Sequence, residues 1–429
     1  MRRLLARAGR TPLLSGLPPE VGVIAAIAFC VALGFGIVAP ALPIYASSFG
    51  VSAFLAGAVI SVFALMRLVS SPGAGALVDR IGERRVLTTG LIIVAVSSVL
   101  AGLAQSYVQL VVLRGVGGIG SSMFTVSAMA LLLKVVVAEQ RGRAAGAFQA
   151  GFLLGGVAGP AVGGLVVGIS IRAPFFFYAA TLAAAALVSW RWLPAETPGE
   201  PVPPKEPVPD AEGADTEAET GPANPPEPTP AAPQSLGAAL RNRSYQAALA
   251  ANLTNGFVTF GLRSSLVPLF VIEGLNSDAT LSGMGFLVAA ATQAILLLPA
   301  GRMADERGRR PALLVGTLLT LIGMGALVIA GSSWLFLVAM AISGLAAAFM
   351  GSAPAAVAGD IVGPGGKGIV IAVFQMTADF GAIVGPLLAG FLADQLGYAP
   401  AFAVGAAVAA LALVLAAVMP ETLRARQHH

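Results

Sequence analysis

The side chains that could do chemistry in this sequence are four ionisable groups inside long apolar segments. Asp379 is the carboxylate nearest the middle of such a segment, and Arg67, Arg114 and Arg263 each interrupt another. If these segments cross a membrane, each charge costs about 2.5–3.5 kcal/mol on insertion scales and persists mainly with a partner or a task. Proton binding at Asp379 and ion pairing are therefore the chemistry to expect.

Other chemistry finds little support in the sequence. The only histidines, His428 and His429, end the chain and resemble the remnant of a purification tag, and Cys30 is the single cysteine. No nucleophile–base set is visible. GVGGIG (115–120) lies in an apolar segment with no preceding strand, and GPGGKG (363–368) lacks the Ser or Thr that follows Lys in a P-loop. We expect no enzyme activity, no metal site and no cofactor.

A further set of charges recurs in two loops. GALVDRIGERR begins at Gly75, and GRMADERGRR begins at Gly301, 226 residues later. The same offset relates Gln149 to Gln375. A half-chain duplication inside an apolar protein is typical of two-bundle membrane transporters.

The elements that must position these residues are membrane-spanning helices. Hydrophobic residues make up 57% of the chain and charged residues 11%, against about 25% charged in soluble domains. Runs such as 86–104, 175–192 and 401–419 can each cross ~30 Å of hydrocarbon. We predict an all-α membrane protein with twelve transmembrane helices in two pseudo-symmetric six-helix bundles. Their centres lie near Val31, Ser61, Val94, Val126, Val157, Ala184, Phe257, Leu287, Leu321, Met340, Ala382 and Ala410.

Two bundles and three polar segments follow from the composition along the chain. We expect an N-terminal tail (1–19), a first bundle (20–194), a disordered linker (195–244), a second bundle (245–420) and a C-terminal tail (421–429). Between Pro194 and Pro233 lie thirteen prolines and nine acidic residues, a composition that cannot bury enough apolar area to fold. Residues 234–244 are expected to form a short surface helix.

The placement of basic residues predicts the orientation. With the N-terminus inside, the cytoplasmic segments hold eighteen Lys and Arg residues, whereas the external loops hold only Arg172. This bias predicts that both termini are cytoplasmic. It also explains the net charge of +4 without nucleic-acid binding.

Four motifs carry a resemblance to a known family. The loop pattern G-x-L-x-D-R-x-G-x-R is matched at 75–84, and L-G-x5-P-x-x-P at 33–43. R-x-x-x-G-x-G is matched at 114–120, and G-x-x-x-G-P-x-x-G-G at 155–164. The last uses Gly155, Gly159, Pro160, Gly163 and Gly164. The chain therefore resembles the major facilitator superfamily, and within it the twelve-helix drug:proton antiporters, in which the glycine–proline pattern marks exporters.

The resemblance implies that the loop motif is a gate. In the family the counterpart of Asp79 caps the positive N-terminal end of helix 11, here near Lys367–Ile369. The residues implied in gating are Asp79, Arg80, Arg84, Asp305 and Arg309. A simpler alternative is that Asp79, Arg80 and Arg84 only anchor the loop electrostatically.

The resemblance also implies a central cavity. Its candidate lining residues are Phe35, Arg114, Gln149, Asn252, Asn255, Phe349, Gln375 and Asp379. Gln149 and Gln375 obey the repeat, so either could instead form a hydrogen bond between helices.

Arg67 and Asp379 are candidate partners across the bundle interface, where helices 2 and 11 face each other in the superfamily. At 1.5 Å per residue, they lie about 12 Å and 15 Å from the cytoplasmic helix ends. Protonation of Asp379 would break such a pair and loosen the interface, while Arg114 would tune the charge of the site or contact substrate. Alternatively, Arg67 snorkels or bonds backbone carbonyls and Asp379 packs by its own hydrogen bonds.

The expected function is export of a small amphipathic molecule or drug by proton antiport, by a monomer in the bacterial plasma membrane. One departure from the family is that helix 1 (21–46) contains no acid. With Arg114 and Arg263 embedded, an anionic, zwitterionic or neutral substrate is as credible as a cationic one. The alternatives are a proton-independent facilitator or importer of a metabolite, and a non-transporting membrane sensor on the same fold.

Overall fold

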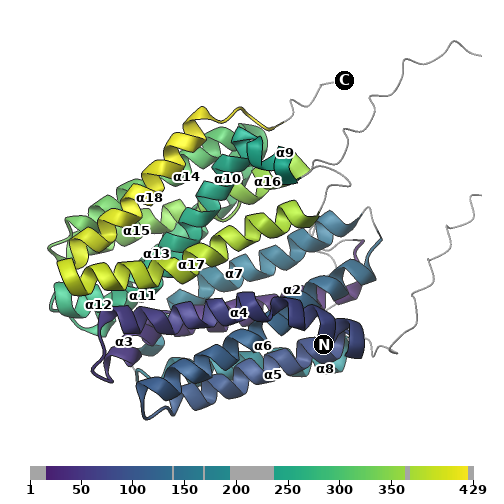
Figure 1. Cartoon of the computed structure of the whole chain (residues 1–429), viewed down its shortest axis with the longest axis horizontal. Helices are drawn as coiled ribbons and strands as arrows, with labels where there is room; N and C mark the ends of the chain where they lie inside the picture. The colour runs from purple at the N-terminus through teal and green to yellow at the C-terminus, as the bar shows by residue number, and fades with distance from the viewer. Residues whose placement is uncertain (1–15, 138–139, 168–169, 194–235, 363–367, 424–429) are drawn as a thin grey trace, which may run out of the picture.

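The computed structural model describes residues 16–137, 140–167, 170–193, 236–362 and 368–423, which form helices joined by short loops (Figure 1). The first half contains α2 (Pro19–Val38), α3 (Ala41–Ser47), α4 (Ala53–Ile81), α5 (Glu83–Gly102), α6 (Tyr107–Val135), α7 (Arg141–Val167) and α8 (Ala173–Trp192). The second half begins with α9 (Leu236–Arg241), α10 (Arg243–Thr254), η2 (Asn255–Leu262), α11 (Arg263–Ser265), α12 (Val267–Leu269) and η3 (Phe270–Gly274). It continues with α13 (Ala279–Glu306), α14 (Arg309–Val328), α15 (Ser333–Met350), α16 (Ala353–Val362), α17 (Gly368–Leu396) and α18 (Tyr398–Val418).

Every predicted membrane segment coincides with helical structure. Among the described residues, eleven helical spans are long and apolar enough to cross a membrane. The twelfth predicted segment corresponds to α7, which is not one of these eleven but has 27 residues, about 40 Å at 1.5 Å per residue. The fold is thus the all-helical membrane fold that the sequence predicts.

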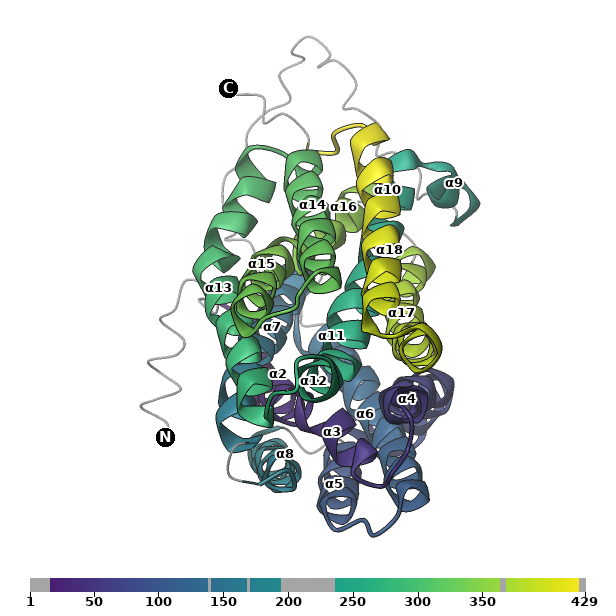
Figure 2. The same cartoon turned by 90° about the vertical axis from the view of Figure 1, so that its left-hand side faces the viewer.

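The two halves form two bundles that lie against each other (Figure 1). The purple-to-blue helices of the first half occupy one side, and the green-to-yellow helices of the second half occupy the other; the end-on view in Figure 2 shows the same division. The bundles meet through α4 against α17 and α7 against α13. Within the predicted linker, α9 forms the short helix expected there, whereas 195–235 lie outside the described residues.

Three of the spans are interrupted, and one of them is the tenth, which passes from α15 to α16 through Gly351 and Ser352. The first passes from α2 to α3 through Ala39 and Pro40. The seventh runs from Arg243 to Gly274 and contains two stretches of wider π-helix, η2 and η3. A π-helical turn frequently occurs at a functional site.

The glycine–proline motif of α7 packs directly on α2. A Cβ atom added to Gly159 would lie 2.5 Å from the carbonyl oxygen of Leu33 and 2.7 Å from the Cα of Gly36. Gly155 and Gly163 meet the backbone of α2 in the same way. Gly164 lies in α7, but its surroundings are outside the described part. Small residues at this spacing let the two backbones touch.

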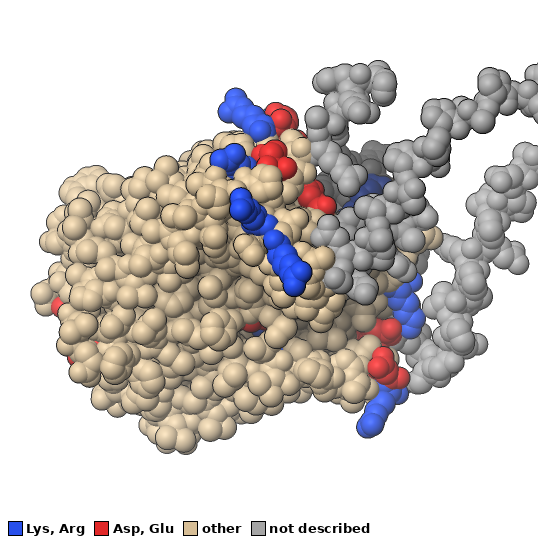
Figure 3. Space-filling view, turned by 45° about the horizontal axis from the view of Figure 1, so that its top comes forward, with Lys and Arg blue, Asp and Glu red and all other residues tan. Residues whose placement is uncertain are grey.

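Charged side chains gather at one end of the molecule. On the face shown in Figure 3 the long sides are uncharged, and most blue and red residues lie toward the end from which the grey segments leave. This end, called here the motif end, carries Gly82 and Gly308, with φ of 89° and 123° at the turns between helices. The opposite end carries the turns at Gly50 and Gly397. An uncharged belt between two polar ends is what a bilayer requires.

Candidate functional site

Arg67 and Asp379 form an ion pair between the two bundles. The Arg67 guanidinium, on α4, donates to a carboxylate oxygen of Asp379, on α17. Their side chains are 35% and 24% exposed. Nearby, the Ser61 hydroxyl of α4 donates to the carbonyl oxygen of Ile383 on α17 at 2.7 Å. The contact predicted from depth is therefore confirmed, while its role in proton coupling remains a prediction.

The π-helical stretch η2 passes beside this pair. Gly256 of η2 lies so close to the backbone of Ala378, the neighbour of Asp379, that a Cβ atom would collide with it. On the other side of the pair, Gly118 of α6 approaches the backbone nitrogen of Arg67. Backbone from both bundles therefore borders the ion pair, which fixes the positions of its two helices.

Arg114, on α6, is a buried cation near the same interface. It is 2% exposed, and its guanidinium carbon lies 4.4 Å from the centroid of the Phe63 ring. Arg114 makes no hydrogen bond with a described residue, and its Nε atom is buried without a partner. A cation–π contact of this kind offsets part of the cost of burying the charge.

A small pocket adjoins Arg114 between the bundles. Most of its lining comes from the first half, and one residue comes from the second. The lining residues are Phe35, Val38, Ala39, Leu42, Ile60, Phe63, Arg114 and Ser264. Two of the candidate cavity residues, Phe35 and Arg114, are thus brought together.

The other cavity candidates lie elsewhere. Asn252 is buried and its amide donates to the carbonyl oxygen of Phe374 at 2.6 Å, so it joins α10 to α17. Phe349 packs in the core of the second half, against Gly316 of α14. Asn255 begins η2 and is partly buried. Neither Asn252 nor Phe349 lines the pocket.

Gln149 and Gln375 are both exposed. Neither side chain makes a hydrogen bond with a described residue. Among the described residues, therefore, neither glutamine forms the hydrogen bond between helices that was the alternative to a place in the cavity.

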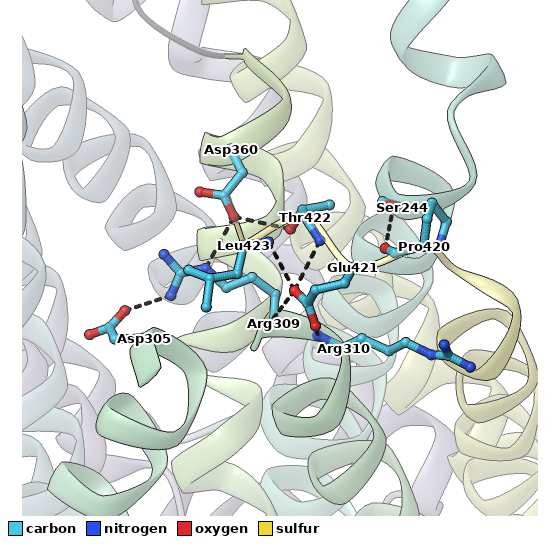
Figure 4. Close-up of polar contacts among 9 residues, drawn as sticks. All are labelled: Ser244, Asp305, Arg309, Arg310, Asp360, Pro420, Glu421, Thr422 and Leu423. Carbon is cyan, nitrogen blue, oxygen red and sulfur yellow. Dashed lines mark hydrogen bonds and ion pairs between the residues drawn. The ribbon is translucent and has the colours of Figure 1, made fainter. Parts of the chain in front are cut away.

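The second copy of the loop motif is held in a polar network at the motif end (Figure 4). The Arg309 guanidinium donates to Asp305 at 2.5 Å and to Asp360 of α16 at 3.1 Å. The Glu421 carboxylate accepts from the backbone nitrogens of Arg309 and Arg310, at 2.8 and 3.0 Å. It thereby caps α14 from outside the motif, because a helix N-terminus binds carboxylates.

The first copy is arranged differently. Asp79 and Arg80 are exposed, and Arg84 donates to the carbonyl oxygen of Trp190. Asp79 makes no hydrogen bond or ion pair with a described residue. Lys367, near which the gating contact was expected, lies outside the described residues, so gating by the motif remains a prediction.

The first glycine of the motif does not bring two helices close together in this conformation. A Cβ atom at Gly75, or at Gly301 in the second copy, would meet no atom within 4 Å. The backbone conformation instead requires glycine at the turn residues Gly82 and Gly308, since their φ angles disfavour other residues.

A contact between the bundles at the opposite end was missed by the sequence reasoning. The Asp394 carboxylate, on α17, accepts from the backbone nitrogens of Ala53 and Phe54 of α4, at 2.9 and 3.0 Å. The repeat could have revealed it, because position 168, its counterpart at the same offset, is glycine. Asp394 thus ties the second half to the first turn of α4.

Comparison with known proteins agrees with this architecture. The sequence model of the Major Facilitator Superfamily matches residues 24–291 and 249–428. Over 161 residues (38% of this chain), the sequence is 30% identical to Multidrug resistance protein 2 of Bacillus subtilis (strain 168). Over 149 residues (35%), it is 30% identical to Quinolone resistance protein NorA of Staphylococcus aureus (strain MRSA252). These matches span 40% and 38% of the two relatives' own lengths.

Solved structures share the whole fold. A bacterial homolog of the human lysosomal transporter Spinster, inward-facing and unoccupied, has a TM-score of 0.67 at 17% identity, over 93% of this chain and 94% of its own. The human organic anion transporter MFSD10 (TETRAN) has a TM-score of 0.63 at 17% identity, over 93% and 100%. At this identity the likeness shows the fold alone. With the family model matching nearly the whole chain, this protein is a multi-pass membrane protein and belongs to the Major Facilitator Superfamily of transporters.

Proposed function

We propose that this protein exports a small amphipathic organic molecule in exchange for protons, by alternating access. The observation that carries the proposal is the ion pair between Arg67 and Asp379, because it joins the two bundles that must move relative to each other. Both side chains are partly exposed, and the proposal requires a path for protons to the carboxylate. Binding of that proton removes one charge of the pair and weakens the contact between α4 and α17.

The two ends of the molecule supply the remaining steps of the proposal. Asp394 holds α17 against the first turn of α4 and keeps the bundles together at the opposite end. When the bundles rock, this contact opens and Asp79 closes the motif end, with Arg80 and Arg84 anchoring its loop. Substrate binds between the bundles near Phe35 and Arg114 while either end is open.

The relatives support the direction of transport. Two proteins that are 30% identical over about a third of this chain are named for multidrug and quinolone resistance. Export of drugs is therefore the activity to test first. By the positive-inside rule, the motif end faces the cytoplasm of a bacterial plasma membrane.

The decisive experiment is proton flux in proteoliposomes with an imposed pH gradient. The native chain is compared with Asp379→Asn, which keeps the shape of the side chain but cannot ionise. Glu306→Gln is the matched control, because it removes an exposed carboxylate at the motif end. We expect substrate-driven proton movement in the native chain and the control, and its loss in Asp379→Asn.

Two results would change the proposal. Transport that continues in Asp379→Asn with unchanged proton dependence would place coupling elsewhere. Transport without any proton movement in the native chain would favour the proton-independent facilitator or importer. We also expect a monomer, which crosslinking in native membranes would contradict if it captured a stable dimer.

A further inference from the structure

Positive charge deep in the described bundles exceeds negative charge. Arg67 is balanced by Asp379, but no described acid pairs with Arg114 or Arg263. The Nε atoms of both Arg114 and Arg263 are buried without a hydrogen-bond partner. Burying an unpaired charge is costly, and truly isolated buried charges are rare. Arg114 is 2% exposed and Arg263 is half-buried, so the need for a balancing group outside these described residues is greatest at Arg114.

One of these cations lines the pocket, and the other adjoins one of its lining residues in the chain. Arg114 lines it from α6, and Ser264, which lines it from α11, directly follows Arg263. The pocket thus lies at the interface between the bundles, where transporters of this architecture hold substrate and coupling ions. The repeat is shifted by one residue in this part of the chain, and at the resulting offset of 225 Arg263 corresponds to the apolar Val38, so the duplicated scaffold alone does not account for Arg263.

The chemistry of the lining is that of an amphipathic anion site. A guanidinium carries five N–H donors in a planar fork that matches a carboxylate, and those of Arg114 have no described acceptor. The remaining lining is apolar or aromatic, and the rings of Phe35 and Phe63 lie 6.0 Å apart. In this conformation the pocket has a volume of about 10 Å³, room for roughly one water molecule, so a larger ligand enters only when the bundles part around Arg114.

We propose that this pocket binds the carboxylate end of an amphipathic organic anion, with Arg114 as its direct partner and Arg263 as the second balancing charge. The inference rests on the proposed transport function and names its substrate class. A cationic drug would instead add a third positive charge beside two unbalanced ones, while Asp379 is already paired. The first span contains no acid between residues 21 and 46, so it offers a cation no carboxylate.

The test is binding of three ligands of one shape by the purified full chain, measured by isothermal titration calorimetry in detergent. The ligands are naphthoate, naphthamide and naphthylmethylamine, which are anionic, neutral and cationic. We expect the native chain to bind naphthoate at least about tenfold more tightly than the other two, a ratio well above the error of the method. Acetate supplies the same carboxylate without the apolar body and should bind far more weakly.

Variants locate the effect. Arg114→Gln should reduce the preference for naphthoate over naphthamide to about one, and Arg263→Gln should reduce it partly. Arg302→Gln is the matched control, because it removes the same charge from an exposed position near the motif end and should leave the preference unchanged. If Arg114→Gln does not fold, Arg114→Lys is measured in its place. The comparison of the three ligands on the native chain still tests whether the pocket prefers a carboxylate.

Several results would overturn the inference. They are equal affinity for naphthoate and naphthamide, preference for the amine, no binding of naphthoate, a carboxylate preference that survives Arg114→Gln, or acetate binding as tightly as naphthoate. None of them bears on proton coupling, which is measured separately as flux. Conversely, a clear carboxylate preference without proton movement would remove the antiport proposal and leave the anion site intact.

Discussion

At the scale of single residues, the tightest constraint is the absence of a side chain. Gly159 touches the backbone of α2 at Leu33 and Gly36, so no rotamer change can make room for a larger residue. Gly156, three residues earlier on the same helix, faces open space. The two positions thus separate the effect of packing from the effect of helix propensity.

We expect Gly159→Val to destabilise the protein by about 1–3 kcal/mol or more, because overpacking forces the backbones of α2 and α7 apart. Gly156→Val should have a much smaller effect, since its Cβ would meet no atom within 4 Å. Thermal unfolding of both variants in detergent measures the difference. Equal loss of stability in the two variants would contradict the packing explanation.

Another residue-scale effect concerns Glu421, which lies outside the membrane spans. Burial raises the pKa of its carboxyl, but hydrogen bonds from the backbone nitrogens of Leu423, Arg309, Arg310 and Thr422 outweigh burial, so its pKa lies below the ordinary value. The unfolded carboxyl therefore binds protons more readily than the folded one. Its stabilising effect is fully present above the ordinary carboxyl pKa of about 4.3 and is lost as the pH falls through the depressed value.

We expect Glu421→Gln to lower the unfolding temperature at neutral pH, because four backbone N–H groups would then donate to a neutral amide oxygen instead of an ionised carboxylate. As the pH falls below about 4, the native chain should lose the same contribution and the two curves should converge. Thermal unfolding between neutral and acidic pH measures this. A difference that stays constant over the whole range would exclude ionised Glu421 as the cap of α14.

At the scale of helices, the duplication preserves an ion pair but reverses its charges. In the second half the Arg309 Nε lies 3.1 Å from an oxygen of Asp360, and in the first half the Lys134 Nζ lies 3.2 Å from an oxygen of Glu83. Position 83 corresponds to 309 and position 134 to 360 at the same offset of 226. The motif end therefore requires opposite charges at these two helix ends, not a particular sign at either.

This reversal explains why the two loop copies differ. Arg309 also pairs with Asp305 four residues earlier, whereas the corresponding position in the first copy is Glu83, which repels Asp79 instead of pairing with it. Asp79 consequently has no partner among the described residues. Its carboxylate therefore remains available to bind another segment.

A charge exchange tests this account. Lys134→Asp should cost about 1 kcal/mol, because it places two acids together at a partly exposed site. Adding Glu83→Arg should recover most of that stability, since the pair is then arranged as in the second half. Thermal unfolding of the single and double variants measures the recovery. A double variant that is less stable than Lys134→Asp alone would contradict it.

At the scale of the whole molecule, the contacts between bundles lie at different depths. The pair of Arg67 and Asp379 lies near the middle of α4 and α17, whereas Asp394 reaches the first turn of α4 at the opposite end. A carboxylate on a helix N-terminus contributes about 0.5–2 kcal/mol. Such a contact changes the ratio of two conformers by about two- to thirty-fold, which is enough to bias a transporter without trapping it.

We expect Asp394→Asn to open the opposite end. Spin labels at Gln105→Cys and Gly331→Cys, on exposed turns of the two halves at that end, report the separation by pulsed electron resonance in a Cys30→Ser background. The variant should show a larger population at long distance. Asp278→Asn is the matched control, because Asp278 caps α13 within its own half, at 3.2 Å from the Leu281 nitrogen. An equally large shift of the distance distribution in Asp278→Asn would contradict the role of Asp394 in holding the two bundles together at this end.

Hydrophobic length and internal repetition determined the fold from the sequence alone. A helix must satisfy its own backbone in a bilayer, so apolar runs of the right length can adopt little else, and the repeat divides them into two bundles. The same reasoning placed Arg67 and Asp379 at similar depth, because depth along a helix is a count of residues.

Only the tertiary structure decided which polar residues meet. Asn252 and Phe349 were expected in the cavity, but rotation about their helix axes directs them to α17 and to the core of the second half. Asp394 reaches α4 across more than 300 positions of sequence, and Glu421 caps α14 from beyond the last span. Contacts of this kind depend on how one helix is rotated and shifted against another. The apolar pattern of the sequence constrains this rotation and shift only weakly, because the helices are apolar on nearly every face.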